Sequence, residues 1–347
     1  MKSNITFNLK KHMAKLKLKH LLALLILPSV QYAQHTDIIN SNRPGETMSA
    51  YAVGKSVIQA EVGIYGIKQH HDLLDYDANG FGLDATVRWG VFKENLEVIA
   101  TLQYQNEQVS APFFNTNRSA LKQTILGAKY LIYDPFKNYK EKANIYSWKA
   151  NHSFKWRQFI PAVSVFAGAN ITSSNNPYAY SNKNPYTSNL KGGLSPKIML
   201  ITQNHLGNGS WVFVTNFIAD YVTTDYPSYG YVLTLTKGIN KKWSGFVENQ
   251  GFKSDLYSDA IVRGGAAYLL SDDMQVDASL SSSLKNTPSV VYGGIGFSWR
   301  YDANHKDVIV RLDSGKKKDK KQDKAVDKLK KAKKKNKKNK KETEVKI

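Results

Sequence analysis

One short stretch of the chain carries residues that could bind a metal ion. Residues 75–80 read DYDANG, which places oxygen ligands at the first, third and fifth positions and a turning glycine at the sixth, as in the first half of a calcium-binding loop. The twelfth position, where such a loop needs a bidentate glutamate, is Thr86. His70 and His71 are adjacent, so in a strand their side chains would point to opposite faces. We therefore interpret this stretch as a solvated turn that leads into a strand, and we predict neither a metal site nor a cofactor.

The sequence shows no recognisable set of catalytic residues. It lacks the Gly-x-Ser-x-Gly, His-Glu-x-x-His and glycine-rich phosphate-binding patterns. A lipase would need a serine, a histidine and a polar partner close together, and His152 and His205 fall in or beside predicted connections. Because such triads assemble in space rather than along the chain, an enzyme stays open as an alternative. The prediction is a protein that is not an enzyme, with no catalytic residue assigned.

The net charge of +21 comes mostly from the two ends of the chain. The first 34 residues contribute six positive charges, residues 315–347 contribute a net twelve, and the 280 residues between them carry only three. A basic protein often binds nucleic acid through a charged face of its folded domain. Here the body of the chain is nearly neutral, so the charge does not indicate such a face.

The N-terminus has the three parts of an export signal. Residues 1–19 carry six lysines and no acid, residues 21–27 (LLALLIL) are purely apolar, and Ala33 precedes Gln34 at a suitable cleavage point. Seven apolar residues are too few for a membrane-spanning helix, which needs about 20. The chain has no cysteine, which excludes a lipid-anchored N-terminus and disulfides. We predict a signal peptide over residues 1–33, and because an exported chain meets no nucleic acid, we predict no such partner.

The body of the chain is dominated by runs of about ten residues in which apolar and polar side chains alternate. In residues 81–89 (FGLDATVRW) the odd positions are apolar, whereas Asp84 and Arg88 lie on the other face. Twelve such runs cover residues 57–67, 80–90, 96–107, 121–133, 156–170, 189–206, 211–223, 229–238, 242–253, 259–270, 274–285 and 289–301. Alternation alone also fits a soluble sandwich, but an even strand number with both ends on one side is typical of a bacterial transmembrane barrel.

Two further patterns favour the barrel over the sandwich. Connections at one end, such as 91–95, are short, and those at the other end (68–79, 110–120 and 172–188) are long, as expected of periplasmic turns and outer loops. The exception is residues 134–155, a long connection on the short-turn side. Aromatic residues also sort toward the strand ends, as in the girdles at the two membrane surfaces. The predicted girdle residues are Trp89, Trp211, Trp243, Trp299, Tyr104 and Tyr221.

The polar faces of these strands should point into the barrel, because a basic side chain that faces lipid costs about 2–4 kcal/mol at the bilayer centre. Such side chains could line a solute pathway, or they could form a closed, salt-bridged interior that only stabilises a narrow barrel. Both interpretations remain open at this point. The predicted lumen-lining residues are Gln59, Glu61, Asp84, Arg88, Glu97, Gln103, Lys129, Asn216, Asp220, Glu248, Asp277 and Arg300.

Several segments resemble a known bacterial family. Residues 42–47 (NRPGET), followed by 58–63 (IQAEVG) with glutamine and glutamate two residues apart, are similar to its opening, and residues 264–277 and 293–298 (GGIGFS) to its C-terminal third. This is the outer-membrane transporter family named for the meta pathway of phenol degradation. The resemblance implies an outer-membrane barrel with a transport function. Asn42 stands where the family often has an acid, and the 46-residue extension after the last strand is not part of its pattern.

These patterns predict an all-β protein, a single antiparallel transmembrane β-barrel of about 12 strands over residues 57–301, in the outer membrane of a Gram-negative bacterium. A periplasmic segment (34–56) should precede the barrel and a disordered basic tail (302–347) should follow it. The predicted function is passage of small solutes, and their apolar or aromatic character rests on the family name alone. A structural or cell-wall-anchoring barrel and an outer-membrane enzyme such as a lipase are the alternatives. The predicted partners are outer-membrane lipid, a small-molecule solute and, for the tail, cell wall or anionic lipid.

The tail can be tested by itself. Residues 315–347 hold 17 lysines and five acids, so the charges repel one another and the segment should be extended. A polybasic segment gains about 1 kcal/mol per lysine near an anionic surface. Deleting residues 315–347 should leave the heat-modifiable mobility of the barrel unchanged and lower its co-sedimentation with isolated cell wall at low salt. Equal sedimentation of the two forms, or a truncated chain that does not fold, would contradict this prediction.

Overall fold

The computed structural model describes residues 39–136, 146, 156–172, 176–178, 193–207, 209–224, 227–255 and 257–302. The predicted signal peptide, and the predicted basic tail beyond Asp302, lie outside these residues. The described chain forms strands and a short 3-10 helix, η1 (Trp156–Phe159). The strands are β1 (Val57–His71), β2 (Tyr76–Gly90), β3 (Leu96–Ala111), β4 (Phe114–Tyr133), β5 (Ala162–Thr172), β6 (Gly193–Leu206), β7 (Trp211–Asp220), β8 (Ser228–Gly238), β9 (Trp243–Ser254), β10 (Ser258–Ser271), β11 (Met274–Ser283) and β12 (Ser289–Asp302).

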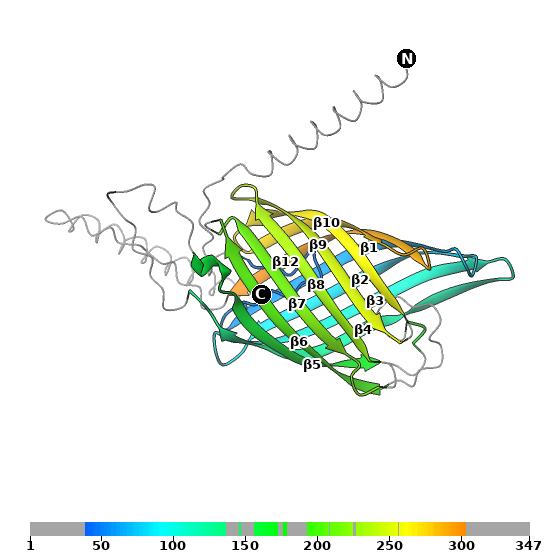
Figure 1. The fold of residues 1–347 in the computed structure, drawn as a ribbon, viewed down its shortest axis with the longest axis horizontal. Helices are drawn as coiled ribbons and strands as arrows, with labels where there is room; N and C mark the ends of the chain where they lie inside the picture. The colour runs from blue at the N-terminus through cyan, green and yellow to red at the C-terminus, as the bar shows by residue number, and fades with distance from the viewer. Residues whose placement is uncertain are drawn as a thin grey trace, which may run out of the picture. The chain divides into compact units, whose positions relative to one another are not determined.

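The strands close into a barrel in which each pairs with its neighbours in sequence (Figure 1). β1 and β12 complete the ring in an antiparallel register that runs from Val57 opposite Asp302 to His70 opposite Ser289. The first and last strands therefore begin and finish at the same end of the barrel, termed the terminal end. The prediction of a twelve-stranded antiparallel barrel is confirmed. In the described ranges no helix is long and apolar enough to span a membrane.

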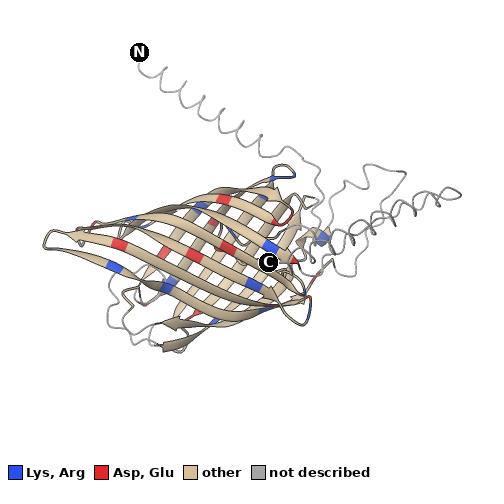
Figure 2. Ribbon diagram, turned by 180° about the vertical axis from the view of Figure 1, so that it is seen from behind, with Lys and Arg blue, Asp and Glu red and all other residues tan. Residues whose placement is uncertain are grey.

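Alternation gives the barrel an apolar outside and a polar inside. On β1, Ile58, Val62 and Ile64 are 41–47% exposed, whereas Gln59 and Glu61 between them are buried. Figure 2 shows that residues of both charges are spread along the strands of the barrel wall. An exposed band of large aliphatic and aromatic side chains around a closed barrel is suited to contact with lipid, and this is the wall of a transmembrane barrel.

At the end opposite the terminal end, β1 to β4 are longer than predicted. β1 and β2 continue to a turn at residues 72–75, and β3 and β4 to a turn at 112–113, so the predicted loops over 68–79 and 110–120 are wrong. Figure 1 shows the β3–β4 hairpin reaching beyond its neighbours. Beyond the membrane both faces of a strand can meet water, so polar residues replace the apolar half of the alternation and the strand resembles a loop in sequence.

Two aromatic residues do not lie where the strand pattern placed them. Trp156 belongs to η1 rather than to β5, and its side chain is 80% exposed. Tyr221 does not belong to an exposed girdle, because the chain turns after β7 with a φ of 54° at Tyr221 and leaves this side chain only 5% exposed. Of the other predicted girdle residues, Trp89, Trp243 and Trp299 are exposed, and Trp211 and Tyr104 are half-buried.

Two adjacent residues of β12 should report the two faces of the wall. Phe297 is 37% exposed on the outer face, whereas Ser298 is fully buried and its hydroxyl lies 2.7 Å from that of Ser41. The chain has no cysteine, so single introduced cysteines can be labelled cleanly. Phe297→Cys should react with a membrane-partitioning maleimide in intact membranes, and Ser298→Cys should not. Equal labelling at both positions would show that the register of β12 is wrong.

Candidate functional site

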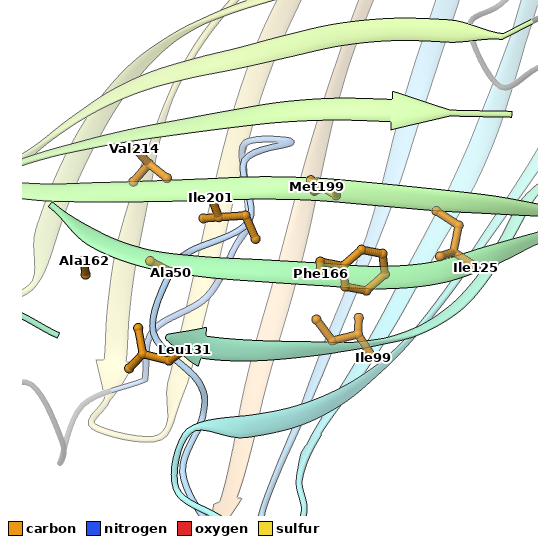
Figure 3. Close-up of a cluster of buried hydrophobic side chains, with 9 residues drawn as sticks. All are labelled: Ala50, Ile99, Ile125, Leu131, Ala162, Phe166, Met199, Ile201 and Val214. Carbon is orange, nitrogen blue, oxygen red and sulfur yellow. The ribbon is translucent and has the colours of Figure 1, made fainter. Parts of the chain in front are cut away.

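The first described residues of the chain lie inside the barrel. Residues 39–56, termed the lumenal segment, form no strand and contact the inward faces of the wall. Ser164 on β5 donates a hydrogen bond of 2.5 Å to the carbonyl of Ala50, and Figure 3 shows Ala50 among inward-facing side chains. We predicted a periplasmic appendage over residues 34–56. The structure instead makes residues 39–56 part of the barrel interior.

Three fully buried charged side chains hold the lumenal segment through its backbone. The Glu97 carboxylate on β3 lies 3.1 Å from Arg88 on β2 and 2.7 Å from Lys129 on β4. Arg88 donates to the carbonyl of Asn40 at 2.8 Å, and Lys129 donates to that of Ser49 at 2.6 Å. Glu97 in turn accepts a backbone N–H of the segment at 2.8 Å. Since buried charges are costly unless every partner is supplied, the wall and the segment depend on each other.

Arg43 fixes the lumenal segment to a second part of the wall. Its guanidinium pairs with Asp84 on β2 and lies 3.4 Å from Asp277 on β11. It passes over Gly63 on β1 and Gly296 on β12, which face each other in the β1–β12 register. A Cβ atom at either glycine would collide with the guanidinium. The arginine therefore fits a notch that exists only because both wall positions lack a side chain.

Glu248 on β9 binds the next residues of the lumenal segment. Its carboxylate accepts the backbone N–H of Glu46 at 3.1 Å and that of Thr47 at 3.4 Å. Arg263 on β10 pairs with the same carboxylate and lies 3.6 Å from the Glu46 carboxylate. The segment thus has charged attachment points on both sides of the β1–β12 closure.

One side of the interior is apolar. The ring of Phe166 lies against Gly127 and Gly168, and a Cβ atom at either glycine would collide with the Cζ end of the ring. From the lumenal segment, Met48 and Tyr51 pack against the same cluster. The lumenal segment therefore has a polar side, bonded to charged groups, and an apolar side. The buried members of this cluster are Ala50, Ile99, Ile125, Leu131, Ala162, Phe166, Met199, Ile201 and Val214 (Figure 3).

A cavity of about 250 Å³ lies between the lumenal segment and the wall. Residues 42–48 of the segment line one side of it. Ile125 and Met199 belong to its apolar wall, and Gln103 and Gln123 belong to its polar wall. The barrel interior is therefore not filled completely by the segment, and the remaining space meets both kinds of surface.

The structure places the predicted lumen-lining residues on inward faces, but only some of them come together. Glu61 joins the network of Arg88, 3.4 Å away, whereas Asp220 lies apart from it and pairs with Lys197 at 3.1 Å. That these residues line a solute pathway stays a prediction. Gln59, Glu61, Arg88, Glu97, Lys129, Asn216, Asp220, Glu248 and Asp277 are buried, and Asp84, Gln103 and Arg300 are half-buried.

Sequence analysis missed the role of Arg43 and the apolar part of the interior. Arg43 lies outside every strand, so alternation could not assign it a face. The apolar interior did leave a signal, because residues 198–201 (IMLI) have apolar side chains at inward and outward positions alike, and two of the three inward positions in residues 162–166 (AVSVF) are also apolar. Where part of a membrane strand has no polar face, the lumen beside that part of the strand is expected to be apolar.

The candidate metal-binding stretch begins in the turn after β1 and continues as the first residues of β2, so most of it is strand rather than the predicted solvated turn. His70 Nδ1 lies 3.0 Å from Asp77, and its Nε2 lies 3.3 Å from Asp72. Within the described part of the chain, no three side chains of the types that ligate metals converge on one point.

The closed wall, the lipid-facing band and the polar interior define an outer-membrane β-barrel. The chain belongs to the family described as "Putative MetA-pathway of phenol degradation", whose profile matches residues 41–301. The resemblance seen in the sequence is confirmed by this match.

Several solved structures are similar to this chain at low identity. An outer membrane channel from Pseudomonas putida F1 has 11% identity and a TM-score of 0.47, and the match covers 76% of this chain and 100% of that chain. The CymD monoaromatic hydrocarbon channel has 10% identity and a TM-score of 0.36, with 72% and 90% covered. The translocator domain of the autotransporter NalP from Neisseria meningitidis has 11% identity and a TM-score of 0.41, with 72% and 89% covered. No curated protein matches the sequence.

Replacing Arg43 should loosen the lumenal segment. Arg43→Ala would leave the Asp84 and Asp277 carboxylates without their cation and would empty the glycine notch. We expect faster hydrogen–deuterium exchange over residues 39–56 and a higher ion conductance in planar bilayers than for the unmodified protein. Arg118→Ala, which removes a partner of Glu107 away from the segment, is the matched control. If both variants behave alike, Arg43 does not hold the segment.

Proposed function

We propose that this protein is an outer-membrane channel for small apolar solutes, including aromatic ones. The observation that carries the proposal is the cavity inside the barrel, which is bounded on one side by Ile125, Met199 and their apolar neighbours. Sites for small molecules are concave and largely apolar, with a few polar groups that orient the ligand. A water-filled pore, by contrast, has a polar interior.

The dimensions support passage of one small molecule at a time. A cavity of about 150 Å³ lined by aliphatic side chains is large enough to hold benzene. The cavity here measures about 250 Å³, and the lumenal segment lies across the interior beside it. This arrangement fits a narrow route for single molecules better than a wide aqueous pore. The family description refers to phenol degradation, which supports aromatic compounds as solutes.

A barrel with only a structural role is the less favoured alternative. The charged network around Arg88 and Glu97 would serve that role equally well. Protein interiors, however, are normally packed to the density of organic crystals, with few voids larger than a water molecule. A purely structural interior gives no reason for a cavity of about 250 Å³ beside an apolar wall.

Uptake by whole cells tests the proposal. Cells that produce the protein should take up labelled toluene faster than cells that lack it. Ile125→Asn should lower this protein-dependent rate about three- to tenfold, because a polar amide in the apolar wall must be desolvated when the solute binds. Val109→Asn is the matched control, since Val109 is buried in a separate cluster with Tyr76 and Ala78.

The outcome that would overturn the proposal is toluene uptake that does not depend on the protein. Equal loss of uptake in the Ile125 and Val109 variants would show that the apolar wall has no particular part in it. If the purified protein instead hydrolyses outer-membrane lipid, the enzyme alternative takes its place.

A further inference from the structure

Two glutamines face the cavity from neighbouring strands. Gln103 on β3 and Gln123 on β4 are register partners, and both line the cavity. The register shifts between Gln103 and Tyr104, which marks a β-bulge, and bulges redirect side chains. At this bulge β4 turns both Gln123 and the preceding Lys122 inward, with the Lys122 ammonium 3.2 Å from Gln105. The irregularity thus places a pair of amides at one height of the cavity wall.

Neither amide is used by the fold. Within the described ranges, the side chains of Gln103 and Gln123 make no hydrogen bond to another residue. Each carboxamide has two N–H donors and an acceptor oxygen, and polar groups inside proteins are usually hydrogen-bonded. Groups of this kind that face a cavity are available to whatever occupies it.

Four of the charged groups that line the same cavity form two ion pairs. Arg43 pairs with Asp84, and the Lys197 ammonium lies 3.1 Å from Asp220. A solute that carried a charge would lose its hydration without gaining an unpaired counter-charge from these groups. The amide pair, by contrast, can bind a neutral polar group without disturbing an ion pair.

The amide pair lies next to the apolar wall. Ile125 is the inward position that follows Gln123 on β4, about 7 Å along the strand at about 3.3 Å per residue. Gly127 follows in turn, with the Phe166 ring lying over it. A single-ring molecule can therefore contact the apolar wall with its ring while a substituent reaches the amides.

We propose that Gln103 and Gln123 are specificity-determining residues. They select small apolar solutes that carry one neutral group able to donate and accept a hydrogen bond, such as a hydroxyl or a carboxamide. This inference rests on the proposed channel function and adds the chemistry that distinguishes one apolar solute from another.

Benzyl alcohol and ethylbenzene test the selection, because they differ only by a hydroxyl in place of a methyl group. Protein-dependent initial uptake of both would be measured for the unmodified protein, for Gln103→Met/Gln123→Met, and for Gln108→Met. Gln108 is the matched control, an exposed glutamine on the same strand. The double variant should lower the ratio of benzyl alcohol to ethylbenzene uptake about three- to tenfold, as expected for the loss of a neutral hydrogen bond or two. The control should leave the ratio unchanged.

The outcomes separate this inference from the channel function. If neither solute depends on the protein for uptake, the proposed function fails and the selection fails with it. If uptake depends on the protein but the ratio is the same in the double variant, the selection alone is overturned. Heat-modifiable mobility verifies that each variant folds. If the double variant does not fold, the single variants Gln103→Met and Gln123→Met replace it. Each single variant is expected to show part of the change in the uptake ratio.

Discussion

The structure depends on one constraint, which is that charged groups enclosed by a narrow membrane barrel need partners inside it. The outer face of the barrel contacts lipid, so charged side chains such as Arg88, Glu97 and Lys129 must point inward. Their partners are one another and the backbone of the lumenal segment. That segment forms no strand, so its carbonyl and N–H groups are free to bond to side chains. The wall and the lumenal segment therefore supply each other's hydrogen-bond partners.

A second consequence is that the two sides of the interior differ. Arg43 pairs with Asp84 on β2, and Arg263 on β10 pairs with Glu248 on β9, whereas aliphatic side chains and Phe166 gather on β3 to β7. The segment matches this division, because its arginine and backbone groups face the ion pairs while Met48 and Ala50 face the apolar cluster. The cavity lies where the two surfaces meet and offers both to a solute. The polar and apolar surfaces that the cavity offers therefore depend on how the wall holds the lumenal segment.

Glycines at inward positions of the strands leave space inside the barrel for other side chains. Twelve strands give an interior between that of small, side-chain-filled barrels and that of wide porins, so any element that crosses it must displace something. Gly63 and Gly296 make room for the Arg43 guanidinium, and Gly127 and Gly168 make room for the Phe166 ring. A strand glycine often marks such a close approach. Here it is the inward position of each glycine that decides what the interior can hold.

The sequence by itself determined the wall, and only the tertiary structure decided the interior. Alternation with a period of two identifies strands because each strand must separate a lipid face from an inner face, a constraint that acts locally on every residue. It therefore predicted twelve strands and the inward position of residues such as Arg88 and Glu248. It failed for the β3–β4 hairpin and for Tyr221, where the chain leaves the membrane and the constraint ends. It could not place residues 39–56, because Arg43 meets Asp84, Asp277 and the glycine notch through contacts that join distant parts of the chain. Closure of the barrel brings those parts together, and no local pattern records which of them will meet.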